Sequence, residues 1–229
     1  MYRKFVNARS PLRLLEKGLH GGLGIGNLGV LIAGHGVGKS SFLVGVGLDE
    51  LLRGGTVLHV ALDQTVSHVR DYYDTVYEAL AASTRLEDAD TTHVEIDNHR
   101  RIRSYKASDF SASKLADAVK IESEAGARPT LIVIDGLDAI QISTGDLAGI
   151  RALAQELAAE VWFTCQTADE HAKGLPSALK EVESLLSVVL VLEPEGDEVT
   201  LRALKDHEND DLHDLHVGLD PRTLLLVRS

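Results

Sequence analysis

The sequence predicts an α/β fold in which helices flank a mostly parallel sheet and antiparallel strands follow near the C-terminal end. Short apolar runs alternate with segments whose apolar residues recur at helical spacing, which is typical of a parallel sheet covered by helices. From residue 187 onward, apolar runs are separated only by turn residues, which indicates antiparallel strands. With 44% hydrophobic residues, the 229-residue chain can bury a substantial core, so we expect a single domain over 1–229.

The first half of the chain provides two clear strands and two helices. We expect strands at "LGVLIAG" (28–34) and "TVLHVAL" (56–62), with a helix between them that begins at Lys39 and stops at Gly54. A second apolar stripe at helical spacing predicts a helix that packs on the core, with Val66, Val69, Tyr73, Val76 and Leu80. The run "HVEI" (93–96) is interpreted as a short strand, and the polar stretch over 97–113 as a crossing.

The second half continues the same alternation. A helix around Leu115 ends near Gly126, and the strand "TLIVIDG" (130–136) follows. The next helix, which contains Ile150 and Leu157, leads to the strand "VWFTCQ" (161–166). The remaining strands are joined by the turns "EPEGDE" and "GLDPRT".

A glycine-rich stretch, "LIAGHGVGKSS" (31–41), matches the phosphate loop, with Ala33 in place of the usual first glycine. Glycines let successive backbone N–H groups point into one concavity, and the helix that follows adds its positive end. Lys39 would reach the β- and γ-phosphates, and the Ser40 hydroxyl would ligate Mg²⁺. The role of His35 stays open. The predicted nucleotide-binding residues are Gly34, His35, Gly36, Val37, Gly38, Lys39, Ser40 and Ser41.

An acidic residue completes this prediction. Asp135 ends the nearly all-apolar strand "LIVID", so its carboxylate should emerge at the carboxyl edge of the sheet, where α/β proteins bind ligands. There it would hold the water shell of Mg²⁺ opposite Ser40. ATP and Mg²⁺ are therefore the expected ligands. Asp138 is interpreted as a helix or turn cap.

Composition limits the class of partner. Asp and Glu outnumber Lys and Arg by 35 to 23, and a formal charge of -12 argues against a general nucleic-acid or membrane-surface binder. We find no secretory signal and no long apolar run, so we expect a soluble, cytoplasmic protein. The single cysteine, Cys165, is expected to be a small core residue. A basic N-terminal arm over 1–20 is interpreted as a surface strap or a subunit contact.

Four segments together resemble the RecA superfamily, in particular the group that contains RadA, KaiC-like proteins and the DnaB helicases. They are the phosphate loop with its approach (21–41), "LIVIDGLDAI" (131–140), "WFTCQT" (162–167) and the closing segment over 174–210. The resemblance implies a RecA-like P-loop NTPase core and a homo-oligomer, such as a hexameric ring. It also implies that Gln166 senses the γ-phosphate and that Lys205 reaches the ATP of the adjacent subunit.

Two departures from that family affect turnover. Asp206 and His207 stand where the family has asparagine and arginine. The water-activating glutamate of the family falls on "HVALDQ", where Asp63 is the only acid. Asp63 is one methylene shorter than Glu, and Gln64 can orient water but cannot accept its proton. A misplacement of about 1 Å costs on the order of a hundredfold, so we expect slow hydrolysis, or none.

Three functions follow. The first is an oligomeric ATP-binding switch with weak ATPase activity, resembling the KaiC-like branch. The second is a DNA-handling motor or recombinase, which the non-basic loops at 136–146 and 167–178 disfavour. The third is a nucleotide-gated scaffold that does not hydrolyse. The stretch "KDHENDDLHDLH" (205–216), with His207, His213 and His216, is interpreted as a solvated acidic hairpin rather than a metal site.

Overall fold

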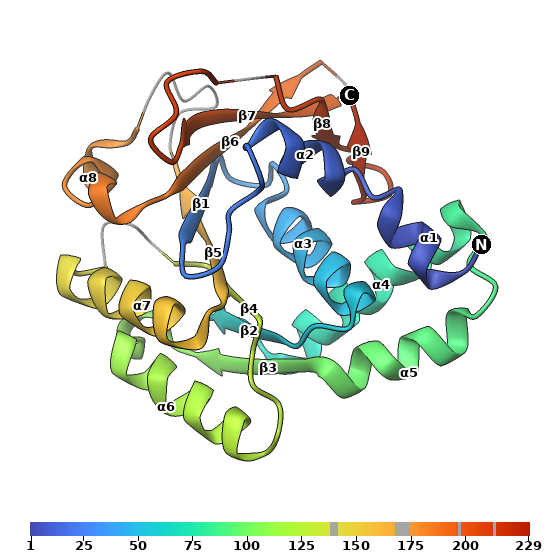
Figure 1. Cartoon of the computed structure of the whole chain (residues 1–229), viewed down its shortest axis with the longest axis horizontal. Coiled ribbons are helices and arrows are strands. Elements are labelled where there is room, and N and C mark those ends of the chain that lie inside the picture. The colour runs from blue at the N-terminus through green and yellow to red at the C-terminus, as the bar shows by residue number, and fades with distance from the viewer. Residues whose placement is uncertain (138–141, 168–174, 197, 213) are drawn as a thin grey trace.

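One nine-stranded sheet runs through the part of the chain that the computed structural model describes, residues 1–137, 142–167, 175–196, 198–212 and 214–229. The strand order is β3-β2-β4-β5-β1-β6-β7-β8-β9. Figure 1 shows the sheet between two groups of helices. The strands are β1 (Leu28–Ala33), β2 (Val57–Leu62), β3 (Arg100–Tyr105), β4 (Leu131–Asp135), β5 (Glu160–Gln166), β6 (Val188–Glu195), β7 (Glu198–Asp206), β8 (Val217–Leu219) and β9 (Leu226–Arg228).

The type of strand pairing changes once across the sheet, at β6. From β3 to β6 every pairing is parallel, and from β6 to β9 every pairing is antiparallel. This arrangement confirms the predicted α/β class, with a mostly parallel sheet and C-terminal antiparallel strands. All residues of β1, β2 and β4 are buried, as expected for parallel strands that helices cover on both faces.

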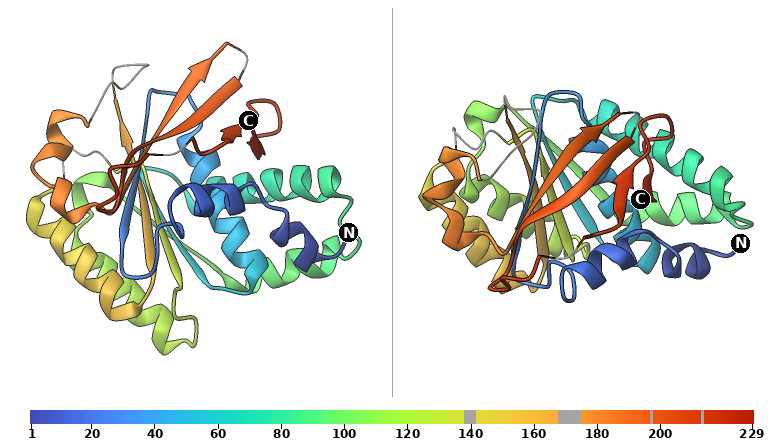
Figure 2. Two further views of the ribbon diagram at one scale, coloured as in Figure 1. Left: turned by 45° about the horizontal axis from the view of Figure 1, so that its top comes forward. Right: turned by 90° about the horizontal axis from the view of Figure 1, so that it is seen from above.

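Two layers of helices enclose the sheet. Figure 2 shows α6 and α7 on one face and α3, α4 and α5 on the other. Phe42 and Tyr73 belong to the core between the sheet and α3/α4, whereas Leu115 and Ile150 belong to the core under α6 and α7. The helices are α1 (Arg3–Ala8), α2 (Leu12–Gly18), α3 (Lys39–Arg53), α4 (Val66–Thr84), α5 (Ala89–His99), α6 (Ala112–Glu124), α7 (Thr144–Leu157) and α8 (Ser177–Lys180), with short 3-10 turns at Ala107–Asp109 and Glu183–Leu185.

Local sequence signals set several helix ends. The side chains of Thr65, Ser111 and Ser143 each accept a hydrogen bond from the backbone N–H three residues later, which caps α4, α6 and α7. Helix α3 ends at Gly54, which adopts the left-handed conformation that glycine tolerates best, as the sequence predicted. No helix in the described ranges is long and apolar enough to span a bilayer.

The region over 89–105 corrects a prediction. "HVEI" lies inside α5, where Thr92 and Ile96 are buried one turn apart, and the stretch expected to be a crossing contains strand β3. Strand β3 is polar because it lies at the edge of the sheet and pairs only with β2. Arg101 and Arg103 both pair with Glu122 of α6, so charged side chains replace the apolar pattern that identifies inner strands.

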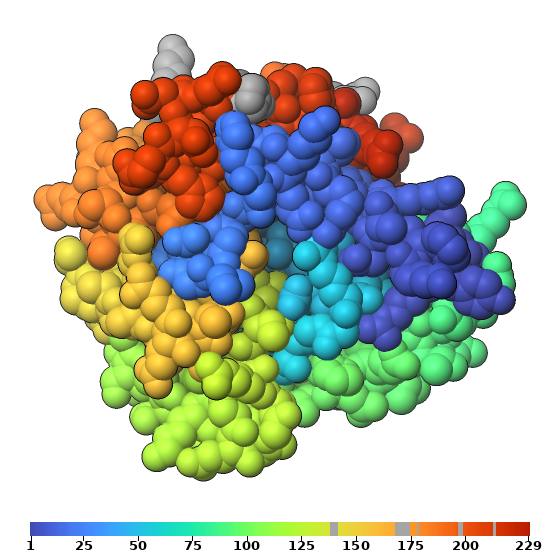
Figure 3. Space-filling view, in the orientation of Figure 1, coloured from blue at the N-terminus to red at the C-terminus, as the bar shows by residue number. Residues whose placement is uncertain are grey.

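The N-terminal arm is folded onto the domain. Its leucines Leu12, Leu15 and Leu19 are buried in the core beside α3. Arg3 donates from Nε and Nη2 to the carbonyls of Leu52 and Leu51, at 2.8 and 3.0 Å, where α3 ends and its dipole is negative. Figure 3 shows the arm, in dark blue, lying over the surface beside α3 and the C-terminal strands. The arm is therefore a strap over the surface whose leucines anchor it in the core, and its role as a subunit contact stays a prediction.

Truncating the arm's leucine at position 15 should destabilise the whole domain. Leu15→Ala removes a side chain that is 4% exposed, so the free energy of unfolding should fall by about 2 to 5 kcal/mol. Phe5→Ala is the matched control, because Phe5 lies on the same arm and is 48% exposed; its effect should stay within about 0.5 kcal/mol. Urea denaturation measures both. Equal, small effects would show that the arm is only loosely attached.

Candidate functional site

A cavity of about 770 Å³ opens at the carboxyl edge of the parallel strands. Loop residues 35–41 form its base, and Asp135 and Gln166 reach it from the ends of β4 and β5. The start of α4 and the segment around β8 form its walls. The cavity therefore lies where open α/β sheets bind ligands, and where the sequence predicted the site.

The phosphate loop connects β1 to α3. Gly36 and Gly38 have φ values of +75° and +118°, a region that glycine enters without strain. A Cβ at Gly38 would lie 2.2 Å from Cδ2 of Leu219, so the C-terminal segment packs directly on the loop. No side chain caps the first turn of α3. The first backbone N–H groups of this helix are therefore available to an anion.

Lys39 folds back over the loop. Its Nζ donates to the carbonyl oxygens of Gly34 at 2.7 Å and Ala33 at 3.2 Å. Burial lowers the pKa of this half-buried amine, and the negative charge of Asp135 opposes that shift. The ammonium thus rests on weak partners inside the cavity, from which a phosphate can recruit it.

Asp135 is the acid of the cavity. It is 4% exposed, and Oγ1 of Thr164 on β5 lies 3.4 Å from its Oδ1 as a donor. Thr164 in turn accepts from the N–H of Gly136 at 3.3 Å. Ser40 lines the same cavity, so a hydroxyl and a carboxylate both face it, which is the donor chemistry that Mg²⁺ prefers. The residues present fit a hard divalent cation.

Asp63 does not take the place that the sequence suggested. Its Oδ1 accepts from the N–H of Ala107 at 3.1 Å, its backbone N–H donates to Tyr105, and the residue does not line the cavity. The cause is local: Asp63 has a φ of +57°, in a tight turn that directs the carboxylate toward the end of β3. Gln64, the next residue, does line the cavity.

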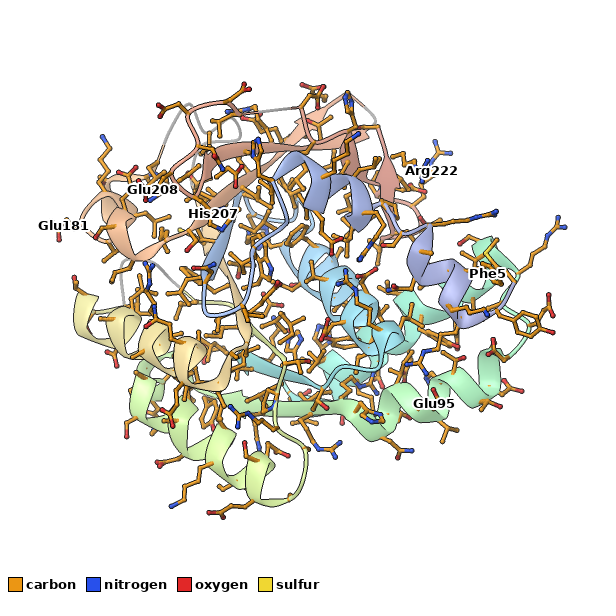
Figure 4. All side chains as sticks on the ribbon, viewed as in Figure 1. Phe5, Glu95, Glu181, His207, Glu208 and Arg222 are labelled. Atoms are coloured by element: carbon orange, nitrogen blue, oxygen red, sulfur yellow. The ribbon has the colours of Figure 1, made fainter. Side chains whose placement is uncertain are left out.

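Lys205 lies near the amino-terminal ends of the parallel strands, on the side of the sheet away from the cavity. Strand β7 runs antiparallel to β6, so the end of β7 lies beside the amino-terminal end of β6. Its Nζ donates to the carbonyl of Glu183 at 2.9 Å. His207 is bound to Asp206 and to the carbonyl of Leu23, at 2.8 and 3.0 Å. Figure 4 shows His207 far from Phe5 across the molecule. A role of Lys205 at the phosphates of an adjacent subunit stays a prediction.

Some sequence predictions fall outside the described ranges. They concern Asp138, His213 and parts of the two candidate DNA loops, 138–141 and 168–174. Cys165 is buried, as expected for a core residue. Of the acidic hairpin, the described residues His207 and His216 each pair with the carboxylate of a neighbouring aspartate.

Several residues that line the cavity were not predicted as site residues. Tyr72 of α4 hydrogen-bonds to the hydroxyl of Ser41 beside the loop. Leu219 and Leu224, with Pro221, form an apolar wall. His59, in the middle of β2, also lines the cavity. Only His59 left a signal in the sequence, because it is the one ionisable residue in the apolar run "TVLHVAL".

His59 is 1% exposed, and this burial lowers its pKa to about 4. Asp135 raises the pKa in opposition, and Arg100 lowers it further. Its Nδ1 lies 3.2 Å from the hydroxyl of Tyr73, whereas Nε2 has no hydrogen-bond partner among the described residues. A buried, neutral imidazole with one nitrogen that has no partner among the described residues therefore forms part of the cavity floor, together with the loop.

A second group of titratable side chains lies outside the cavity. Asp74, His93 and Asp97 each offer one atom that could bind a metal ion, and these three atoms lie within 4.8 Å of one another. Arg100 pairs with both carboxylates, at 3.3 and 2.5 Å, and already supplies the positive charge that a metal ion would bring. This group is an ion-pair network around a buried guanidinium.

No protein-family model matches the chain, and a search of curated proteins finds no match either. The chemistry of the cavity therefore rests on this chain's own residues.

Acid should weaken the folded state through His59. The pKa of His59 is about 4 in the folded chain and 6.5 when unfolded, so between these values only the unfolded chain takes up the proton. Stability is therefore full above pH 6.5 and falls, by about 3 kcal/mol, as the pH drops toward 4. His59→Phe lacks this loss. Urea denaturation without nucleotide measures the free energy of unfolding of both proteins. Between pH 6.5 and 4, the value of the wild type should fall by that amount relative to the value of His59→Phe. An unchanged difference between the two values would contradict the prediction.

Proposed function

We propose that the chain binds ATP with Mg²⁺ in this cavity, hydrolyses it slowly, and works as a nucleotide-dependent switch in a homo-oligomer. One observation carries the proposal: the ammonium of Lys39, the carboxylate of Asp135 and the uncapped start of α3 share a single cavity. A magnesium-bound triphosphate requires these three features: a cation for the phosphates, a carboxylate for the metal, and backbone N–H donors at a helix start.

The phosphates would occupy the concavity of residues 34–41. The backbone N–H groups at the start of α3 provide donors, and the helix dipole favours negative charge there. Lys39 would exchange its contacts with Ala33 and Gly34 for the β- and γ-phosphates. Mg²⁺, held by Ser40 and through its water shell by Asp135, would neutralise charge on the phosphates.

The base and sugar would lie against the cavity walls. On one side α4 provides Val69 and the aromatic ring of Tyr72, and on the other the C-terminal segment provides Leu219, Pro221 and Leu224. A volume of about 770 Å³ is within the range of small-molecule sites, about 300 to 1,000 Å³. An aromatic base buried between these side chains would gain affinity from apolar contact.

Slow hydrolysis follows from the shortage of carboxylates in the cavity. Among the described residues that line the cavity, Asp135 is the only acid, and it is assigned to the metal. Gln64 and Gln166 can orient a water molecule but cannot take its proton. The buried His59 belongs to the floor of the cavity. Oligomerisation would matter for turnover if Lys205 of one subunit reached the phosphates of the next.

Removing the ammonium at position 39 should weaken nucleotide binding. Lys39→Ala loses a charged hydrogen-bonding partner, a contribution of about 1.5 to 3 kcal/mol, or roughly 10- to 150-fold in dissociation constant. Titration calorimetry with ATP and Mg²⁺ measures the loss. Lys120→Ala, at an exposed lysine of α6, is the matched control and should bind as the parent does. Unchanged affinity in Lys39→Ala would remove the phosphate-loop assignment.

Hydrolysis should be insensitive to the acid at position 63. Asp63→Asn keeps an oxygen that can accept from Ala107, and the side chain lies outside the cavity. Steady-state phosphate release should therefore stay within about threefold of the parent. A general base contributes about 10²- to 10⁴-fold, so a loss of that size would identify Asp63 as the base and require its turn to rearrange.

A further inference from the structure

The floor of the cavity contains one polar side chain that the nucleotide chemistry described above does not use. His59 is buried within an otherwise apolar strand, and its Nε2 has no partner among the described residues. An unpaired polar atom in a buried position destabilises the folded chain, because the atom loses its hydrogen bonds to water. A partner that becomes available only when the cavity is loaded would account for that cost.

Strand register places this imidazole next to the predicted magnesium acid. Ala61 of β2 is opposite Asp135 of β4, and His59 is two residues earlier on the same face of β2. From ordinary strand spacing and rise, the Cα atoms of His59 and Asp135 are about 8 Å apart. Both side chains line the cavity, and the charge of Asp135 acts on His59. The imidazole and the carboxylate therefore share one face of the sheet at the cavity, and the structure records no hydrogen bond between these two described residues.

Tyr73 holds the other nitrogen of the ring. Its hydroxyl is 3.2 Å from Nδ1 of His59, and the two rings meet edge to face with centroids 5.5 Å apart. Gly47 of α3 makes room for this arrangement, because a Cβ there would lie 2.4 Å from the Tyr73 hydroxyl. If the ring carries its proton on Nε2, the Tyr73 hydroxyl donates to Nδ1.

We propose that His59 is a positioning residue for Asp135, donating from Nε2–H to the carboxylate when Mg²⁺ and nucleotide bind. Thr164 is the donor to Oδ1, no described residue donates to Oδ2, and we assign the second oxygen to the imidazole. With both contacts made, the carboxylate is fixed toward the ion's water shell. This inference rests on the proposed function and assigns a role that the phosphate loop itself does not predict.

The test compares nucleotide binding with and without the metal. His59→Phe keeps an aromatic ring next to Tyr73 but removes the donor, and His59→Gln restores an N–H donor. ADP binding is measured by calorimetry, once with Mg²⁺ and once with a chelator. Outer-shell partners typically contribute 10- to 100-fold in metal affinity. We expect His59→Phe to weaken Mg²⁺-dependent binding by about tenfold or more, with binding in chelator unchanged, and His59→Gln to recover most of it.

Thr164→Val is the matched comparison, because it removes the other donor to Asp135 in a side chain of similar shape. It should show the same metal-specific loss. A purely structural role of His59 predicts a different result, equal weakening with and without Mg²⁺. That result, or unchanged Mg²⁺-dependent binding in His59→Phe, would overturn the proposal.

A second measurement does not depend on nucleotide. Nitrogen NMR of the ligand-free protein reports which ring nitrogen of His59 carries the proton, and we expect Nε2. A proton on Nδ1 would overturn the proposal even if ADP binds. Conversely, a wild-type protein that binds no ADP, with or without Mg²⁺, would overturn the proposed function, and the proposed loading of His59 would fail with it. The two failures are therefore distinguishable.

Discussion

Backbone hydrogen bonding on both sides of β1 fixes the place of the phosphate loop and of the cavity around it. Strand β1 pairs in parallel with β5 on one side and β6 on the other, and all of its residues are buried. Its carboxyl end is therefore held in a single position, and the loop over 34–38 begins there. Parallel neighbours bring their own carboxyl ends to the same edge, which is why Asp135 and Gln166 reach the cavity from different parts of the chain.

The sequence was most informative where burial is two-sided. The inner parallel strands β1, β2, β4 and β5 are mostly apolar runs of five to seven residues and were expected, whereas the edge strand β3 was missed. A strand with one partner needs little apolar surface, and Arg101 and Arg103 of β3 instead pair with Glu122. Ile96 in "HVEI" is buried by a helix rather than a sheet, and four residues are too few to tell the two periods apart.

In the candidate site, too, the residues set by local sequence were predicted, and those set by contacts between distant segments were not. Residues 34–41 and Asp135 were predicted because their chemistry is carried by local spacing and by the end of a strand. The direction of the Asp63 side chain was not, because it depends on a backbone dihedral and on the N–H of Ala107, which is far along the chain. The place of His59 depends on the pairing of β2 with β4, which no local pattern specifies.

The contact between Leu219 and the loop at Gly38 has a kinetic consequence. Strands β8 and β9 have three residues each and end the sheet, so few backbone hydrogen bonds hold them, whereas the buried Val217 and Leu219 anchor β8 in the core. Lifting this hairpin would uncover the cavity while the inner strands stay folded. The lifetime of any molecule bound there would then be set by how often the hairpin opens. A bound molecule would in turn slow amide exchange and proteolytic cleavage in the hairpin.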